Sequence, residues 1–330
     1  MKVATFSTKP HDEEFLLARG SEDAHEFIFF QNQLRLETAS LAQGCQAVCV
    51  FVNDDLSEGC LRELHAIGVR LVVLRCAGFN NVDLRAADEL GITVLRVPDY
   101  SPYAVAEYAL AMLMTLGRRI HKAYSRVRDG NFALKGLMGF DLHGKTVVVL
   151  GTGKIGAVFC QILKGFGVRV LASDPFPNPE LEALGVEYGA LNDILPQADV
   201  LSLHCPLTPE THHMINDASL GLCKDGVYLV NTSRGGLVDA TAAIKHLKNG
   251  KIGGMALDVY EEEADLFFEN LSDVVIADDV LMRLTTFPNV LITSHQAFFT
   301  REALERIAQV TRENLDAFER GDTEFVNRVS

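Results

Sequence analysis

Residues 146–159, TVVVLGTGKIGAVF, run from a short apolar segment through three closely spaced glycines into a helical pattern. The glycines are Gly151, Gly153 and Gly156, in the spacing G-x-G-x-x-G. In a dinucleotide-binding turn the first glycine permits a tight turn, the second lets backbone approach a pyrophosphate, and the third lets helix pack closely on strand. The flanking strand and helix patterns favour this function over an ordinary turn. Such a turn normally opens its domain, which leaves the first 145 residues to be explained.

The next strand-like segment, residues 168–174, ends in Asp174, eighteen residues after Gly156. A carboxylate at this position can accept hydrogen bonds from the hydroxyls of the adenosine ribose. A phosphate on that ribose would meet a like charge, so the sequence predicts NAD rather than NADP. The alternative is that Asp174 only caps the following turn, DPFPNP.

Short apolar segments alternate with helical patterns along the chain, which is typical of an α/β fold with parallel sheets. Two sets of strand-like segments occur, one within residues 2–97 and one within residues 145–296, and 330 residues suffice for two domains. The segment between the sets is predicted to be one long, largely apolar helix, with Pro102 in its first turn and Gly130 after its basic end. Such a helix is usually buried between domains or subunits.

Composition excludes several classes of protein. Thirty basic against 44 acidic residues give a net charge of -14, which argues against nucleic acid or an anionic membrane as a partner. No apolar run is long enough for a signal peptide core or a membrane span, so a cytoplasmic protein is expected. The seven cysteines form no CxxC pair, and adjacent His212 and His213 are not expected to face one ion from a regular element. We therefore predict no metal.

Three polar residues with complementary chemistry follow later strand-like segments, namely Arg234, Glu263 and His295. Parallel strands bring their carboxyl ends to one edge of a sheet, where these side chains can converge. Reduction of a 2-oxo acid requires a carboxylate anchor, which suits the guanidinium of Arg234, and a proton donor, which suits His295. Glu263 would favour the charged imidazole and orient it through a hydrogen bond.

Taken singly, each of the three has an ordinary explanation: a surface ion pair, a solvated carboxylate and a core histidine. Together with Asp174, however, the chain carries the motifs GTGKIG, LHCPLTPET, NTSRGGLVD, LDVYEEE and SHQAF in this order. With these motifs it resembles the D-isomer-specific 2-hydroxyacid dehydrogenases over essentially its full length, and is most similar to the fermentative D-lactate dehydrogenases of bacteria. The resemblance implies that Arg234, Glu263 and His295 have the catalytic roles described above and that NAD is the cofactor.

The resemblance implies further site residues. The loop RCAGFNN resembles one whose backbone N–H groups hold the substrate carboxylate, which points to Ala77 and Gly78, and Tyr100 matches a substrate contact. Phe51 and Phe298 match positions near the apolar pocket for the substrate side chain, although plain core packing explains them equally well. The matching cofactor contacts, beyond the three glycines and Asp174, are Lys154, Ile155, Cys205, Pro206, Thr232, Ser233, Arg234 and Asp258.

In this family the NAD domain is inserted into the substrate domain, which would explain the position of the glycine turn. The resemblance implies a flavodoxin-like substrate domain of residues 1–99 and 299–330 and a Rossmann NAD-binding domain of residues 100–298. It places hinges near residues 99–101 and 297–300, with the substrate in the cleft between the domains. The family uses the long helix after the first hinge as a dimer contact, so a homodimer or tetramer is expected.

Residues 264–286 form an insertion that is similar to the longer segment of D-lactate dehydrogenases. It favours the reversible reduction of pyruvate to D-lactate. Two alternatives remain open: the same chemistry on another 2-oxo acid, such as hydroxypyruvate or a branched-chain acid, and an NAD-sensing scaffold like the corepressors of this fold. Formate dehydrogenases need no proton donor, so the Glu263 and His295 pair argues against that activity.

Overall fold

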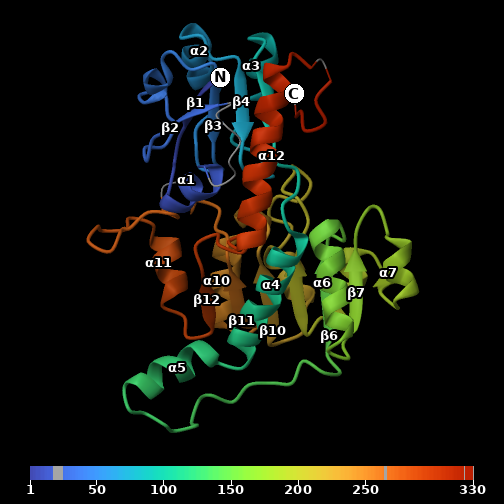
Figure 1. Ribbon diagram of the computed structural model, residues 1–330. Coiled ribbons are helices and arrows are strands. Elements are labelled where there is room, and N and C mark those ends of the chain that lie inside the picture. The colour runs from blue at the N-terminus through green and yellow to red at the C-terminus, as the bar shows by residue number, and fades with distance from the viewer. Residues whose placement is uncertain (18–24, 264–265, 323, 330) are drawn as a thin grey trace. The chain divides into compact units, whose positions relative to one another are not determined.

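The computed structural model describes residues 1–17, 25–263, 266–322 and 324–329 (Figure 1). The chain divides into two compact units, one of Met1–Ser101 and Phe299–Ser330 and one of Pro102–Phe298. We call them unit 1 and unit 2. Since the two ends of the chain share unit 1, unit 2 is an insertion into it. The first boundary follows Ser101, so Tyr100, which was assigned to the second domain, belongs to unit 1.

Unit 1 is built on a parallel sheet in the order β2-β1-β3-β4-β5. Every residue of the third and fourth strands is buried, as expected for a parallel sheet that is covered on both faces. The strand-like segments predicted within residues 2–97 are confirmed as strands of this sheet. They are β1 (Lys2–Thr5), β2 (Glu26–Phe29), β3 (Ala47–Val50), β4 (Leu71–Leu74) and β5 (Thr93–Arg96).

The C-terminal helix belongs to unit 1. It packs against the first helix and against β4 and β5, and its Leu315 is fully buried in an apolar cluster with residues of β1, β3, β4 and β5. The side chain of Asn314 donates a hydrogen bond to the carbonyl of Arg96 at 3.0 Å. The helices of unit 1 are α1 (Pro10–Leu17), η1 (Ala39–Ala42), α2 (Glu58–Ala66), α3 (Leu84–Glu89) and α12 (Arg301–Glu319).

Unit 2 contains a seven-stranded parallel sheet in the order β12-β11-β10-β9-β6-β7-β8. The chain order reverses between β6 and β9, and ligands of open α/β sheets bind at the carboxyl ends of the strands at such a point. The short strand β8 was not predicted, because two residues carry no periodic pattern. The strands are β6 (Thr146–Leu150), β7 (Arg169–Ser173), β8 (Glu187–Tyr188), β9 (Val200–Leu203), β10 (Val227–Asn231), β11 (Ile252–Leu257) and β12 (Val290–Ile292).

Alternate residues of β6 face two separate apolar cores. Val147 and Val149 pack with residues of α4 and α6, whereas Val148 and Leu150 pack with residues of α9, α10 and α11. The sheet is therefore covered by helices on both faces, as in a doubly wound fold. The helices are α4 (Pro102–Gly117), α5 (Ile120–Arg128), α6 (Lys154–Lys164), α7 (Pro179–Ala183), α8 (Leu191–Ile194), η2 (Leu195–Gln197), α9 (Asp217–Leu222), η3 (Gly235–Leu237), α10 (Ala240–Lys248) and α11 (Asp279–Thr285).

The prediction of one long helix between the two sets of strands was wrong. The segment forms two helices, α4 and α5, because Arg119 adopts a left-handed backbone conformation with a φ of 57°. A right-handed helix cannot continue through such a residue. Gly139 packs directly on this break, since a Cβ there would lie 2.4 Å from the carbonyl oxygen of Gly117. Along the described residues, no helix combines the length and apolarity needed to cross a membrane.

Candidate active site

The glycine turn joins β6 to α6, and its three glycines differ in what surrounds them. A Cβ at Gly151, where φ is 90°, would lie 2.6 Å from the backbone nitrogen of Cys205. A Cβ at Gly156 would lie 2.0 Å from the carbonyl oxygen of Gly151. At Gly153, the N-cap of α6, such a Cβ would enter open space, with no atom of the described residues within 4 Å apart from those of its neighbours along the chain. Packing thus requires the first and third glycines, while the second leaves open space at a helix N-terminus, as a pyrophosphate needs.

The adjoining residues of α6 and β7 complete this turn. Lys154 and Ile155 form the first turn of α6, the former exposed and the latter half-buried. One carboxylate oxygen of Asp174 accepts a hydrogen bond from the N–H of Thr152 at 2.6 Å, and the other accepts one from the N–H of Phe176 at 2.8 Å. Asp174 therefore lies beside the glycine turn and also caps the following turn. Its contact with a ribose stays a prediction.

Two strand ends offer further groups to a cofactor. Cys205 is buried just after β9, and the hydroxyl of Ser233 donates to its carbonyl at 2.7 Å. Pro206 is exposed. Thr232 is 7 % exposed, and its hydroxyl oxygen is buried with no hydrogen-bond partner among the described residues. An unsatisfied buried hydroxyl costs about 1–3 kcal/mol, which a polar group of a bound ligand would offset. Together with the space at Gly153, this fits a dinucleotide.

His295 and Glu263 form a close pair. Nδ1 of His295 lies 2.6 Å from Oε1 of Glu263, and only 16 % and 18 % of the two side chains are exposed. The other oxygen of Glu263 accepts a hydrogen bond from the N–H of Tyr260 at 2.9 Å. Because a carboxylate only accepts, Nδ1 carries a proton, and Nε2 is the ring atom that can exchange a proton with a substrate.

Asp258 holds the loop that carries His295. The N–H of His295 donates to the carbonyl of Asp258 at 2.6 Å. The Asp258 carboxylate accepts hydrogen bonds from the N–H groups of Gln296 and Ala297, at 3.0 and 2.8 Å, and from the hydroxyl of Thr293. Burial raises the pKa of this carboxyl above its ordinary value, although these hydrogen bonds act to lower it. The side chain of Asp258, which was predicted to contact the cofactor, is therefore hydrogen-bonded to the loop that carries His295.

Arg234, Glu263 and His295 follow β10, β11 and β12, which are neighbours in the sheet. Nη1 of Arg234 donates to the carbonyl of Ser233 at 2.7 Å. A Cβ at Gly235 would lie 2.0 Å from the carbonyl carbon of Tyr260, so the arginine turn packs directly on the chain that leads to Glu263. The structure thus brings the segments of these three residues to one edge of unit 2.

Unit 1 contains four of the predicted substrate residues. Phe51 follows β3, Ala77 and Gly78 follow β4, and Tyr100 lies near the end of Met1–Ser101. Arg96 donates to the carbonyl of Ala77 at 2.8 Å, and the thiol of Cys76 donates to the carbonyl of Gly78 at 3.3 Å, which fixes this loop. Tyr100 is half-buried. In unit 2, Phe298 is 9 % exposed, which equally fits the alternative of core packing.

A buried charged network, which the sequence patterns do not indicate, lies beneath Phe51. The carboxylate of Asp54, 1 % exposed, accepts hydrogen bonds from the N–H of Phe51 and the hydroxyl of Ser7, both at 2.6 Å. The guanidinium of Arg75 lies 5.3 Å from the centre of the Phe51 ring and 3.1 Å from Asp12. These contacts fix the position of the Phe51 ring. No spacing in the sequence links the four polar residues, so no pattern could have identified them.

Another missed neighbour is Phe268, whose ring centre lies 5.9 Å from that of His295. It belongs to the insertion at 264–286, of which Ala264 and Asp265 lie outside the described residues. In the sequence, this neighbour of His295 was indicated by the insertion, which begins directly after the three glutamates of residues 261–263.

The expectation for His212 and His213 applied to a regular element, which these two residues do not form. Both imidazoles face one carboxylate, that of Glu261. The two residues lie in a turn rather than in a regular element, and His213 has a left-handed backbone with a φ of 48°. The alternation of a strand, which would point neighbours apart, does not apply here.

Comparisons with known proteins agree with this architecture. The family model for the D-isomer specific 2-hydroxyacid dehydrogenase NAD-binding domain matches residues 110–297. The D-lactate dehydrogenase of Escherichia coli K12 is 55% identical over 323 residues, which is 98% of each chain. The chain therefore belongs to the D-isomer-specific 2-hydroxyacid dehydrogenases, a family of oxidoreductases with an NAD-binding domain.

Other relatives extend over similar lengths. A 2-hydroxyacid dehydrogenase homolog of Haemophilus influenzae is 52% identical over 315 residues, covering 96% of this chain and 95% of its own. Among solved structures, the apo form of D-lactate dehydrogenase from Escherichia coli matches with a TM-score of 0.91 and 52% identity, covering both chains completely. D-lactate dehydrogenase from Salmonella matches with a TM-score of 0.86 and 54% identity, also over both complete chains.

Proposed function

We propose that this chain catalyses the reversible, NAD-dependent reduction of pyruvate to D-lactate. The observation that carries the proposal is the 2.6 Å contact between His295 and Glu263, which supplies a 2-hydroxyacid dehydrogenase with its proton donor and acceptor. The choice of pyruvate is supported by relatives named D-lactate dehydrogenase that match over nearly the whole chain.

Substrate binding is assigned to groups of both units. Arg234 forms a charge-assisted contact with the substrate carboxylate and polarises the adjacent carbonyl. The backbone N–H groups of Ala77 and Gly78 bind the same carboxylate, and Tyr100 contacts the substrate. Phe51 of unit 1 and Phe298 of unit 2 are each assigned to the methyl group of the substrate, and the buried network around Asp54 and Arg75 keeps the Phe51 ring in place.

Proton transfer is assigned to His295. When bound, NADH supplies the hydride to C2 of the substrate. The imidazolium of His295 donates a proton from Nε2 to the carbonyl oxygen, and in the reverse direction the neutral imidazole removes it from the hydroxyl. Glu263 stabilises the imidazolium through its charge and fixes the ring through Nδ1. Asp258 keeps the loop of His295 in its conformation.

Cofactor binding is assigned to unit 2 alone. The N-terminus of α6 and the space at Gly153 receive the pyrophosphate. The carboxylate of Asp174 binds the adenosine ribose and disfavours NADP through its charge. The remaining proposed contacts are Gly151, Lys154, Ile155, Gly156, Cys205, Pro206, Thr232, Ser233, Arg234 and Asp258.

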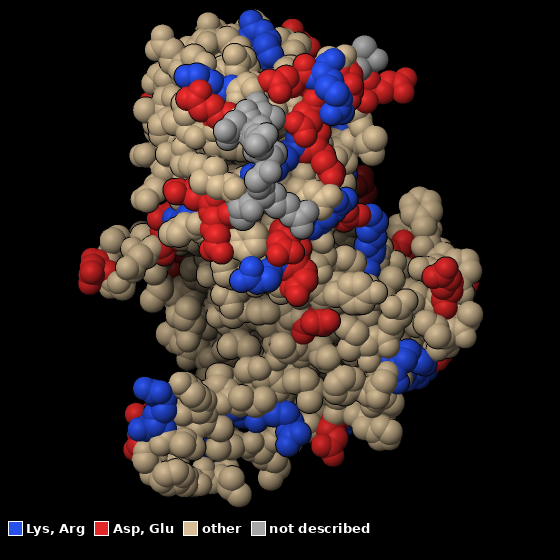
Figure 2. All heavy atoms as spheres, in the orientation of Figure 1, with Lys and Arg blue, Asp and Glu red and all other residues tan. Residues whose placement is uncertain are grey.

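We further propose that the chain forms a homo-oligomer through α5 and the residues that follow it. Tyr124, Phe132, Leu134 and Met138 are 63%, 75%, 84% and 90% exposed. Exposed apolar side chains gathered on one segment mark an interaction surface. In the region of α5, at the lower left of Figure 1 and Figure 2, Lys and Arg side chains are also exposed. Light scattering of the purified protein tests this, and a monomer would contradict it.

A cytoplasmic location accompanies this function. All seven cysteines belong to the described residues, and all are buried free thiols. Unpaired thiols are typical of a reducing compartment, where NADH-dependent metabolism also takes place. Fractionation of the source cells tests this location.

The reaction is tested by NADH oxidation with pyruvate, hydroxypyruvate, 2-oxobutyrate and a branched 2-oxo acid, followed by chiral analysis of the product. Fast turnover of pyruvate to D-lactate is expected. Preference for another 2-oxo acid would keep the mechanism and contradict the substrate. Absence of turnover with all four, despite NADH binding, would favour an NAD-sensing scaffold and contradict the enzymatic function.

A further inference from the structure

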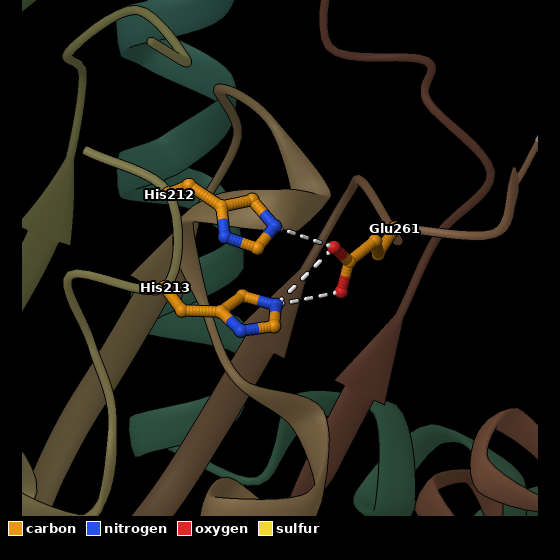
Figure 3. A group of neighbouring side chains, drawn as sticks. All are labelled: His212, His213 and Glu261. Atoms are coloured by element: carbon orange, nitrogen blue, oxygen red, sulfur yellow. Dashed lines mark hydrogen bonds and ion pairs between the residues drawn. The ribbon is translucent and has the colours of Figure 1, made fainter. Parts of the chain in front are cut away.

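Two imidazoles and one carboxylate meet at the surface of unit 2 (Figure 3). His212 and His213 lie in the turn that follows β9, and Glu261 lies beyond the end of β11. Nε2 of His212 is 3.1 Å from Oε1 of Glu261, while Nε2 of His213 is 3.2 Å from Oε1 and 2.9 Å from Oε2. Figure 3 shows both rings with their Nε2 edges toward the carboxylate. The three side chains thus present nitrogen and oxygen donors to one point.

The backbone, rather than side-chain flexibility alone, brings the two histidines together. His213 has a left-handed φ of 48°, and its N–H donates to the carbonyl of Gly236 at 2.8 Å. The two imidazoles stack, with ring centres 3.9 Å apart and planes inclined by 23°. Stacking keeps the two Nε2 atoms side by side, which neighbouring residues of a strand or a helix do not achieve. The donor arrangement is therefore built into the turn.

We propose that His212, His213 and Glu261 bind a divalent transition-metal ion, with Zn²⁺ as the preferred occupant. Their ligand atoms lie within 4.8 Å of one another. Bonds of about 2.0–2.2 Å to Zn²⁺ place tetrahedral ligands roughly 3.3 Å apart, so small side-chain movements bring all three onto one ion. Two imidazoles with one carboxylate suit Zn²⁺ far better than Mg²⁺ or Ca²⁺, which prefer oxygen ligands.

Solvent reaches this cluster directly. The side chains of His212, His213 and Glu261 are 49%, 35% and 32% exposed, so an ion can enter without opening the fold, and water can complete its coordination. In the metal-free protein the Nε2 protons of the histidines donate to Glu261. Binding of the ion at Nε2 displaces each of these protons, which a neutral imidazole takes up again at Nδ1, and places the charge of the ion between the same atoms.

A bound ion would join segments that are distant in sequence. Glu261 lies two residues before Glu263, and the peptide of Tyr260 and Glu261 packs on Gly235, where a Cβ would meet the Glu261 nitrogen at 2.2 Å. His213 is hydrogen-bonded to Gly236 of the same turn. The ion would therefore tie the histidine turn to β11 and raise the thermal unfolding midpoint of the protein. This site uses none of the residues assigned to the reaction and is independent of the proposed substrate.

The test is a calorimetric titration of the reduced, metal-free protein with ZnCl₂ in a non-chelating buffer. One ion per chain is expected, with an increase in the thermal midpoint. E261Q and the double variant H212Q/H213Q should each weaken binding by about 10- to 100-fold or more. E262Q is the matched control, since it removes the same charge from the next residue, and it should bind Zn²⁺ like the parent. MgCl₂ should give no comparable binding.

Two measurements keep the result unambiguous. Circular dichroism verifies that every variant is folded, and Co²⁺ in place of Zn²⁺ provides a visible absorption band that reports nitrogen and oxygen ligands. Loss of the band in H212Q/H213Q, but not in E262Q, is expected. Undiminished Zn²⁺ binding by folded E261Q and H212Q/H213Q would overturn the proposal and assign the ion to other groups, such as thiols. No binding to the parent protein would overturn it as well.

Discussion

Nδ1 of His295 lies 2.6 Å from Oε1 of Glu263, and the backbone of His295 is left-handed, with a φ of 52°. This conformation costs a non-glycine residue about 1–2 kcal/mol. Asp258 offsets the cost, because its buried carboxylate accepts the N–H groups of Gln296 and Ala297. The imidazole thus keeps its orientation through contacts on both its ring and its backbone.

His295→Ala is expected to lower kcat by about 10²- to 10⁴-fold, because the substrate oxygen then has no positioned proton donor. NADH binding should remain nearly unchanged, since the glycine turn is untouched. The chain contains no Trp, so binding is measured through NADH fluorescence and turnover through NADH absorbance. Glu263→Gln should give a smaller decrease in kcat, because an amide still accepts the Nδ1 hydrogen bond without stabilising the imidazolium. Full turnover in folded His295→Ala would contradict the role of this histidine.

The glycine turn permits a matched pair of substitutions. Gly153→Ala adds a Cβ to open space, so its thermal midpoint should equal that of the parent, whereas NADH should bind more weakly because the methyl group occupies the approach of the pyrophosphate. Gly156→Ala places a Cβ 2.0 Å from the carbonyl oxygen of Gly151 and should destabilise the protein by about 1–3 kcal/mol. Thermal unfolding and NADH titration separate the effects. Parental NADH affinity in Gly153→Ala would contradict the location of the pyrophosphate.

The carboxylate of Asp174 is expected to set the cofactor preference. Asp174→Asn keeps a side chain that can accept a hydrogen bond from the N–H of Thr152, but removes the negative charge. The ratio of kcat/KM for NADH over NADPH should fall by about tenfold or more, since the like-charge repulsion of the ribose phosphate is lost. The control is Glu180→Gln, an exposed carboxylate in the first turn of α7. An unchanged ratio in Asp174→Asn would leave this residue with the turn-capping role alone.

Local patterns predicted the parts of the fold that depend on local chemistry. The buried strands were predicted from short apolar runs. The glycine spacing predicted the turn after β6, because a side chain at Gly151 or Gly156 would collide with neighbouring backbone. The motifs also predicted that Glu263 and His295 lie at adjacent strand ends, where the structure brings them into contact.

Features that depend on backbone conformation or on distant contacts escaped prediction. The break at Arg119 follows from a single left-handed residue within a continuous helical pattern. The network of Asp54 and Arg75 joins segments that only the folded sheet brings together. The convergence of His212 and His213 on one carboxylate likewise requires a turn whose conformation no residue pattern indicated.

Asp199 provides a prediction for stability against pH. Its carboxylate accepts hydrogen bonds from the N–H of Thr146 at 2.8 Å and from the ammonium of Lys224 at 2.9 Å. Partial burial alone would raise the pKa of this carboxyl, but these two donors outweigh it and hold the pKa below its ordinary value. A lowered pKa in the folded state means that the ionised form contributes stability above the unfolded pKa of about 3.9, and that this contribution is lost as the pH falls through the folded pKa.

Asp199→Asn should therefore reduce the free energy of unfolding at pH 7 by about 1 kcal/mol, a value below the usual range for charged hydrogen bonds because solvent screens this half-buried group. The difference from the parent should shrink as the pH decreases toward 4 and below, where the parent carboxylate becomes protonated too. Urea unfolding followed by circular dichroism over this range measures it. Lys224→Met, which leaves the carboxylate and the Thr146 contact in place, should show a smaller loss at pH 7. A difference for Asp199→Asn that is the same at every pH would contradict the ionic contribution and leave only a change in packing.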